Sequence, residues 1–383
     1  MTKPRVRLHR DGSVTLLDGF ANVISGIGGA NAKQRGHGYV VDLSQHELEA
    51  AYRSSTWFGK IVDIPADDST REWRSWKAEK EQIEAIEAEE KRLQVRQKVR
   101  QALIWSRLYG GAVIIPGGMP GQPEEPLPVD RVRRGAVKFL TVLHRHDISA
   151  QGIVRDPLSP HFGEPEHYEI STGTGQVRFH PSRVIRINGR EVPNRNGGSD
   201  SWGDSVWMHL SDAILNADAG AAVIGALMQE AKTDVIRLPE MMQNMATAEY
   251  ESLLVKRLTM TATLKGLSNT LLLDKDDEWD QKQITWAGLP EVMRTLLTIM
   301  AGAADIPVTR LTGEQQTGLS GSDAGSLRNY YDAVKAKQEL VLSPQIRPLD
   351  ELLIRSALGD WPDDIWSDWI SLYQLSQKER AEV

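Results

Sequence analysis

One run of small and polar residues approaches the motif of a nucleophilic serine. Gly318-Leu-Ser-Gly-Ser322 resembles the Gly-x-Ser-x-Gly turn, but it has serine where the last glycine belongs, and no apolar strand precedes it. An ordinary flexible loop therefore explains Ser320 better than catalysis does.

Histidines could bind a metal ion at the edge of a strand, or act as an acid–base pair. His144 and His146 stand two residues apart beside Asp147, so on a strand they would share one side. No third ligand follows at a convincing spacing, which favours a structural pair. A two-histidine phosphoesterase needs two His-x-Thr/Ser motifs; His180-Pro-Ser182 fits this pattern, but its proline points to a turn. We expect no catalytic residue, cofactor or metal.

Other signs of phosphate or nucleic-acid chemistry are equally weak. The Gly-x-x-x-x-Gly-Lys-Ser/Thr loop of a packaging ATPase does not occur, and the glycine cluster at 26–29 lacks the lysine. The acidic runs Asp276-Asp277-Glu278 and Asp363-Asp364 could bind a divalent ion, but acidic surface turns look the same. The 11 tryptophans are spread singly without interleaved basic residues, so they are better explained as core or subunit-interface anchors than as base-stacking groups.

Composition describes an ordinary globular protein. The 383 residues are 40% hydrophobic and 25% charged, enough for two or three modules, and the lack of cysteine excludes disulfides and thiolate metal sites. The net charge of −7 argues against a tight grip on phosphates, although it permits DNA to slide past. No apolar run reaches the roughly 18 residues of a membrane span, and the first residues lack the apolar core of a secretory signal. We expect a protein of the cytoplasm, or of a particle assembled there.

Local patterns predict the elements that would position any site. Ser44 and Glu47 have the spacing of a capping box, and Gly110-Gly111 would end a long charged helix. The expected elements of this half are helices at 44–54 and 79–109, a short strand within 57–65, and strands of a mixed sheet at 112–115, 139–143, 168–170 and 184–187.

The most regular segment runs from Val206 to Met228. Apolar residues recur there at steps of four and three, which is typical of one helix face, and the second half is rich in alanine and glycine. Small residues allow another helix to approach closely, either inside the chain or from an identical copy.

The remaining chain predicts a small module and two helices around a loop. Strands at 235–238, 270–273 and 282–286, a helix at 247–258 and an acidic turn at 274–278 precede a helix at 288–304. That helix stops at the Ile306-Pro307 step, because the residue before proline leaves the helical region. A polar loop follows, and then a long helix that Asp323 could cap and that we expect to end before Pro344.

The order of these features resembles the portal proteins of tailed bacteriophages. The resemblance rests on Gly288-Leu-Pro, the Ala303–Gly313 run AADIPVTRLTG, Gly318-Leu, Asn329-Tyr-Tyr-Asp and Gln338-Glu, and more weakly on 52–76, 102–115 and 180–206. It implies a non-enzymatic α+β portal fold that forms a ring, expected to be a dodecamer, at one capsid vertex. DNA would be packaged and ejected through this ring.

The resemblance also implies a division of the chain. It consists of a basic flexible arm at 1–43, a mixed α/β wing at 44–204, a stem helix at 205–231, a clip at 232–286, a returning stem helix at 287–305, a channel loop at 306–323, a long helix bracing that loop at 324–343 and a wing return at 344–383. Ser376 and Glu379 have capping-box spacing just before the end at Val383, so we expect a truncated chain without the C-terminal crown.

Site residues follow from the same resemblance. The channel loop would offer Arg310, Thr312, Glu314, Gln315, Gln316, Leu319 and Ser320 as a polar, nearly neutral collar around DNA. Packing between stems would use Ala217, Ala221, Ile224, Gly225 and Met228, and the clip would dock partners through Asp274, Asp276, Asp277 and Glu278.

The implied partners belong to a virion. They are further copies of the chain, double-stranded DNA bound without sequence specificity, the terminase large subunit, a head-tail connector or adaptor, and the major capsid and scaffold proteins, with no membrane; assembly would take place in the host cytoplasm. The alternative is a nucleic-acid-processing phosphoesterase that uses His180. Size separates the two, because a 42.7 kDa portal subunit assembles into a ring whereas the enzyme would be a monomer or dimer.

Overall fold

The computed structural model describes residues 6–8, 14–16, 43–159, 161–172, 175–191, 202–229, 232–237, 252–256, 259–260, 278–283, 288–313, 322–362 and 364–373. Met1–Glu47 and Leu48–Val383 form two separate units. In the first, β1 (Val6–Leu8) pairs antiparallel with β2 (Val14–Leu16); most of the predicted arm lies outside the described residues.

Two helices open the described chain, α3 (Gln45–Ser54) and α4 (Thr56–Arg71). The predicted capping box of α3 is confirmed, since the Ser44 N–H donates to Glu47 Oε2 at 2.8 Å and the Glu47 N–H to Ser44 Oγ at 3.4 Å. The short strand predicted within 57–65 is wrong. Ser55 caps α4 instead, accepting from the Phe58 N–H at 3.2 Å, and the buried residues follow helical spacing.

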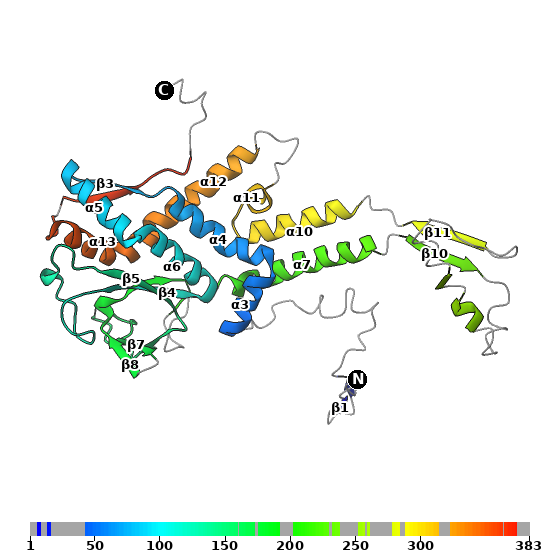
Figure 1. Cartoon of the computed structure of the whole chain (residues 1–383), viewed down its shortest axis with the longest axis horizontal. Helices are drawn as coiled ribbons and strands as arrows, with labels where there is room; N and C mark the ends of the chain where they lie inside the picture. The colour runs from blue at the N-terminus through cyan, green and yellow to red at the C-terminus, as the bar shows by residue number, and fades with distance from the viewer. Residues whose placement is uncertain are drawn as a thin grey trace, which may run out of the picture. The chain divides into compact units, whose positions relative to one another are not determined.

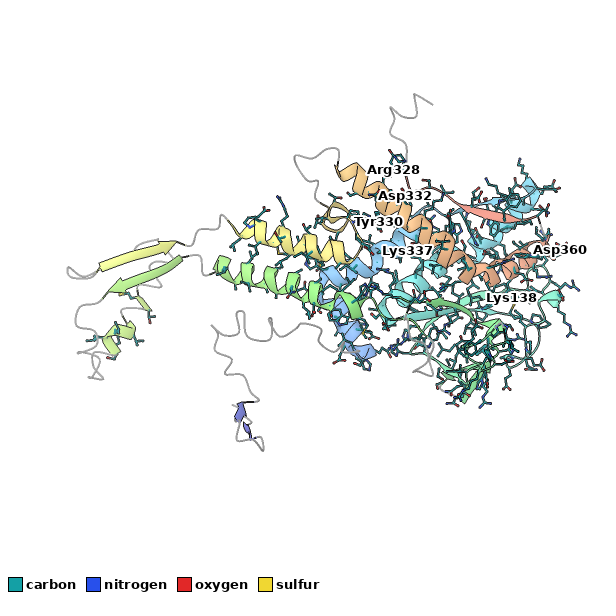
Figure 2. The ribbon with its side chains drawn as sticks, turned by 180° about the vertical axis from the view of Figure 1, so that it is seen from behind. Lys138, Arg328, Tyr330, Asp332, Lys337 and Asp360 are labelled. Atoms are coloured by element: carbon teal, nitrogen blue, oxygen red, sulfur yellow. The ribbon has the colours of Figure 1, made fainter. Side chains whose placement is uncertain are left out.

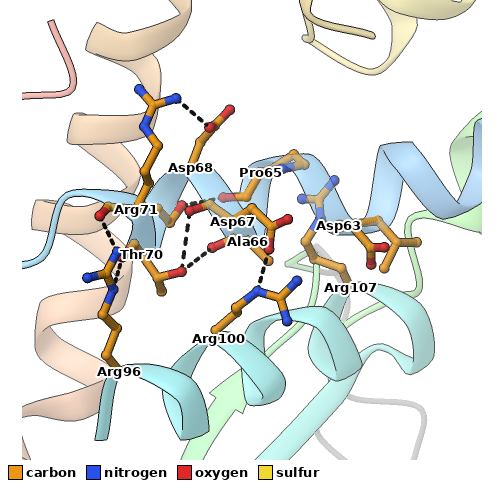
Figure 3. A network of polar contacts seen from close by, with 12 residues as sticks. Asp63, Pro65, Ala66, Asp67, Asp68, Thr70, Arg71, Arg96, Arg100 and Arg107 are labelled. Atoms are coloured by element: carbon orange, nitrogen blue, oxygen red, sulfur yellow. Dashed lines mark hydrogen bonds and ion pairs between the residues drawn. The ribbon is translucent and has the colours of Figure 1, made fainter. Parts of the chain in front are cut away.

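Pro65 lies inside α4 because a distant side chain replaces its missing donor. A proline at this position leaves the carbonyl four residues earlier, that of Ile61, without its helical hydrogen bond. Arg107 Nη2 donates to Ile61 O at 2.8 Å, and its Nε donates to Val62 O at 3.0 Å. Figure 3 shows Arg107 reaching from the neighbouring helix towards α4.

The charged segment predicted as one helix at 79–109 forms two, α5 (Lys80–Leu93) and α6 (Val95–Tyr109). They break at Gln94, whose φ of 54° is left-handed, and Gly110, with a φ of 91°, caps α6 as predicted.

The strands form small antiparallel sheets. β4 (Gly111–Gly117) lies between β5 (Phe139–His144) and β9 (Ile185–Asn188); β6 (Ile148–Gln151), β7 (His167–Thr172) and β8 (Gly175–Phe179) form a second sheet; β3 (Arg74–Lys77) pairs with β12 (Trp366–Trp369). Short 3₁₀ turns span Val129–Arg131 and Pro181–Arg183. The predicted mixed sheet is therefore wrong, because every pairing among the described strands is antiparallel.

We call the main cluster of buried apolar residues the sheet core. Helices α5, α6 and α13 (Ser343–Leu358) pack with β4, β5 and β9 around it (Figure 1). Trp76 on β3 and Trp369 on β12 are also buried in it, so residues near the two ends of the described unit are joined. The last described strand thus pairs with a strand near the beginning of the chain; the division into wing and wing return stays a prediction.

Two long helices, called here the helix pair, pack along each other: α7 (Trp207–Gln229) and α10 (Leu289–Ala303) (Figure 1). Between them in sequence, β10 (Lys232–Arg237) pairs antiparallel with β11 (Glu278–Gln283). Glu278 is therefore the first residue of a strand and not the end of an acidic turn.

After α10, the chain forms α11 (Val308–Thr312), α12 (Ser322–Lys337), a π-helical segment (Gln338–Leu342) and α13. As predicted, α12 ends before Pro344, at Lys337, but the chain stays helical through the π turn and into α13. The Ser343 N–H reaches the Gln338 carbonyl in the wider π turn, and Pro344 falls in the first turn of α13, where its missing N–H costs nothing.

Candidate subunit interface and loop anchor

The helix pair approaches closely at Gly220. A Cβ added to this residue would lie 2.5 Å from Leu296 Cδ1 of α10, the end of a flexible side chain that would have to move. On the same helix Leu210, Ile214 and Ala217 are buried against the chain itself. The sequence predicted a small-residue contact, and Gly220 is one position where the two helices meet.

The remaining surface of the pair is apolar and open. Leu215 and Val223 of α7 are 44% and 53% exposed, and Val292 and Ile299 of α10 are 55% and 58% exposed. By length and composition alone, Trp207–Leu227 is long and apolar enough to cross a membrane. Only 17% of its apolar 18-residue stretch is buried in this chain. The pair thus presents more apolar surface than the chain covers.

The residues predicted for stem packing separate into different environments. Ala217 is buried inside the chain, Ile224 is half-buried, and Ala221 and Gly225 are exposed. The side chain of Met228 lies outside the described residues. Two of the predicted positions are thus available to another subunit, and their role there stays a prediction.

Asp68, on α4, is fully buried and joins three helices. Arg310 of α11 donates to both its carboxylate oxygens, at 3.0 Å from Nη2 and 3.1 Å from Nε. The Tyr330 hydroxyl of α12 donates to Oδ2 at 3.0 Å, and Arg71 adds a contact at 3.3 Å, marked in Figure 3. One carboxylate therefore binds the helices on both sides of residues 314–321; we call this cluster the loop anchor.

The charge of Asp68 keeps both of its main partners in the loop anchor, Arg310 and Tyr330, in their hydrogen-bond-donating forms. The bond to Asp68 raises the pKa of Arg310, so its guanidinium stays charged. Burial, followed by the nearby Asp68 charge, raises the pKa of the Tyr330 hydroxyl, which keeps its proton and its role as a donor. A buried carboxylate that accepts several charge-assisted hydrogen bonds holds the donor side chains firmly in place.

Two further bonds tie the same segments to α4. Lys60 Nζ donates to the Leu311 carbonyl at 2.8 Å, and Gln338 Nε2 donates to the Ser69 carbonyl at 2.8 Å. Leu311 itself is buried. Gly313, with a φ of 81°, then ends α11.

The predicted channel loop therefore begins later than residue 306. Arg310 and Thr312 lie in helix α11, where Arg310 is bound to Asp68 and the Thr312 hydroxyl donates to the Val308 carbonyl at 2.8 Å. The other predicted loop residues lie outside the described residues: Glu314, Gln315, Gln316, Leu319 and Ser320. Arg310 is thus engaged within the subunit, and the exposure of the loop stays a prediction.

Of the residues predicted to dock partners at the clip, Glu278 is among the described residues. The Glu278 backbone pairs with Arg237 in the β10–β11 ladder. Asp274, Asp276 and Asp277 lie outside the described residues.

The histidine candidates have structural surroundings. His144 lies 3.2 Å from Asp147 and stacks near Tyr109, and burial lowers its pKa. His180 Nδ1 accepts from the Ser182 N–H at 3.2 Å, which caps a 3₁₀ turn. Within the described ranges, no group of three histidine, aspartate or glutamate side chains could hold a metal ion.

A family model described as "Phage portal protein" matches residues 46–383. A protein of Sphingomonas paeninsulae named "Anti-CBASS protein Acb1" is 39% identical over 382 residues, covering 96% of this chain. This chain spans only 61% of the length of that relative. An uncharacterised protein of Haemophilus influenzae is 30% identical, with 97% of this chain and 84% of the relative covered.

Solved particle structures have a similar fold. A chain in the neck of an empty gene transfer agent (GTA) particle, computed with C6 symmetry, aligns with a TM-score of 0.52 at 16% identity, over 89% of this chain and 88% of that chain. A chain in the neck of the native particle, computed with C12 symmetry, aligns with a TM-score of 0.50 at 15% identity, over 85% and 84%. At such identities the likeness concerns the fold.

Proposed function

This chain belongs to the phage portal protein family, and from that premise we propose that it is the subunit of a ring at one capsid vertex, through which DNA is packaged and ejected. Portal proteins are structural proteins and not enzymes, so the work of such a subunit is to form a wall, to contact DNA weakly and to dock other proteins.

The exposed apolar surface of the helix pair carries this proposal. The side chains of Val223, Val292 and Ile299 are exposed to water in the single chain. A neighbouring subunit that covered them would gain about 25 cal/mol of free energy per Å² of apolar area buried. A head-to-tail contact between one face of the pair and a different face of the next copy closes into a ring when the rotation fits. The twelvefold neck structure supports twelve copies as the expected number.

The loop anchor supports the DNA-contacting part of the proposal. Residues 314–321 leave α11 and return into α12, and both helices are bound to Asp68. A loop held firmly at its two bases can change conformation at its tip without moving the ring. Its polar residues would let a duplex slide past without a deep electrostatic trap.

The remaining partners follow from the family and the position of each segment. The terminase large subunit and then a head-tail connector would dock on the module between α7 and α10, through its acidic residues 274–278. Major capsid and scaffold proteins would surround the ring in the virion, after assembly in the host cytoplasm. Reversing the charges at 274–278 should weaken docking and leave the ring intact.

The phosphoesterase alternative gains nothing from the geometry. His180 caps a turn through its ring nitrogen, and the charges that act on it are those of Arg183 and His161. The second His-x-Ser sequence, His209-Leu-Ser211, lies on helix α7, where Arg190, Arg107 and Asp305 act on His209. The name of the Sphingomonas relative belongs to a protein of which this chain spans 61%, so it carries no activity over to this chain.

Mass measurement of the purified chain tests the ring directly. Mass photometry should show a species near twelve times 42.7 kDa for the parent. Val223→Asp combined with Ile299→Asp should reduce it to folded monomers, because two charges would be buried in each contact. Leu158→Asp is the matched control, since Leu158 is 91% exposed and lies outside the helix pair. Rings that survive the double substitution would place the interface elsewhere.

A further inference from the structure

A cavity of about 680 Å³ lies where the helix pair meets the sheet core. Its walls come from α4, α6, the first turn of α7, the segment after β9, the end of α10 and the π-helical segment. This volume is in the range of pockets for small ligands, and channel formation alone requires no such space.

Basic side chains from four different elements line this cavity. Arg107 comes from α6, Arg190 from the segment after β9, His209 from α7 and Lys337 from the end of α12. The acidic residues among its lining are Glu191 and Asp305. Two arginines and a lysine thus meet two carboxylates, and His209 adds one N–H donor in its neutral form.

These basic groups act on one another. Burial lowers the pKa of Lys337, and the charges of Arg107 and Arg190 lower it further, while Asp305 opposes them. Burial, then Arg190 and Arg107, lowers the pKa of His209 to about 4. Like charges held together in this way gain when an anion enters between them.

One wall of the cavity is apolar and exposed. Leu340 of the π-helical segment is 77% exposed and Val341 is 50% exposed, and Leu103 of α6 lies in the same lining. Single π turns in otherwise α-helical stretches occur frequently at functional sites. A ligand suited to the cavity therefore has an anionic end and an organic part.

We propose that this cavity binds a phosphate ester of nucleotide size. Lys337, Arg190 and Arg107 hold the phosphate, and Leu340 with Leu103 contacts the organic part. The guanidinium of Arg107 already donates to two α4 carbonyls, so a phosphate bound to it would link α6 and α4 with Arg190 and with Lys337 of α12. The proposal does not depend on ring formation.

Titration calorimetry on the purified full chain tests it with three probes: inorganic phosphate, dAMP and a short single-stranded oligonucleotide. Lys337→Glu and Arg190→Glu should each raise the dissociation constant at least about tenfold, because each removes one attraction and adds one repulsion. Lys138→Glu is the charge-matched control, since Lys138 lies well away from Lys337 (Figure 2) and is not part of the lining.

The probes separate the sources of the phosphate. A dAMP affinity that depends on Lys337 assigns a free nucleotide, and dependence seen only with the oligonucleotide assigns a DNA strand. No binding of any probe at millimolar concentration, or equal weakening by Lys138→Glu, would overturn the proposal. A ring structure in which a neighbour's carboxylate fills the cavity would also overturn it, and would leave the proposed function standing.

Discussion

The sheet core and the helix pair bury their residues in opposite ways. In the sheet core, even a guanidinium is enclosed: Arg74 lies 3.0 Å from Glu90 and 2.6 Å from Asp350, all in one chain. In the helix pair, simple apolar side chains such as Val223 and Ile299 remain half in water. The first region pairs its buried charges within one chain, whereas the second leaves apolar side chains uncovered.

This difference separates folding from assembly. A substitution in the sheet core should change the free energy of unfolding of a single subunit. A substitution on the open side of the helix pair should leave that quantity nearly constant and change the number of subunits in the particle. The predictions below exploit this separation, beginning with the largest effect.

Removing the enclosed guanidinium should be the most damaging change. Although burial works to lower the pKa of Arg74, Asp350 and Glu90 raise it above its usual value, so the group is charged. Arg74→Ala leaves two carboxylates buried without their partner, which costs about 3–5 kcal/mol of unfolding free energy. Urea denaturation measures the loss.

The matched control for this change is Lys80→Ala. Lys80 forms an exposed pair with Glu84 at 4.0 Å, and its removal should cost at most about 1 kcal/mol. Equal losses for the two variants would show that the sheet core is not held by its buried ions.

The loop anchor should give the next largest effect. Asp68→Asn keeps the shape of the side chain but removes the charge that Arg310 and Tyr330 bind, at a cost of about 1–3 kcal/mol. The loss should be local, so limited proteolysis within 314–321 should accelerate more than global unfolding does. Tyr331→Phe serves as the control, because Asp68 is bound by the neighbouring Tyr330 hydroxyl. An unchanged cleavage rate in Asp68→Asn would contradict the anchor.

A pair of glycines tests the two sides of α7. Gly220→Ala places a Cβ 2.5 Å from Leu296 Cδ1, so the leucine side chain must shift, and the change should cost up to about 1 kcal/mol. Gly225 has nothing within 4 Å of an added Cβ, so Gly225→Ala should stabilise the subunit by up to about 1 kcal/mol through helix propensity. Thermal unfolding of monomeric variants distinguishes them. Equal shifts would mean that the helices are not in contact at Gly220.

Much of the local structure was predictable because its causes are local. The capping box at Ser44 and Glu47, the buried strand β4 and the regular helix α7 each follow from a few neighbouring residues. The helix at Pro65 was not predictable, because its missing hydrogen bond is made good by Arg107, which is distant in sequence. The same applies to Pro344, which only a preceding π turn accommodates.

The loop anchor left one faint signal in the sequence. Asp68 stands seven residues after Ile61, so it falls on the apolar side of α4, where a carboxylate needs partners. Which partners it has depends on the packing of α11 and α12, and no local pattern reveals that. For the helix pair, the small residues indicated a close approach but not whether Gly220 or Ala221 meets the same chain.

The smallest expected effect concerns His209, at the junction between the helix pair and the sheet core. In the folded chain its pKa is lowered from 6.5 to about 4 by burial and then by Arg190 and Arg107, against the attraction of Asp305. Between these two values the unfolded chain binds the proton more readily than the folded one, so stability must fall as the pH falls from 6.5 towards 4.

His209→Asn cannot take up that proton. Between pH 6.5 and 5 its melting temperature should therefore drop less than that of the parent, by no more than about 2 °C, because the imidazole is only partly buried and water screens these charges. His46→Asn, on α3, controls for the loss of a histidine. If His209→Asn and the parent lose stability in parallel over this range, the junction is not electrostatically strained, and the contrast between the two regions rests on apolar burial alone.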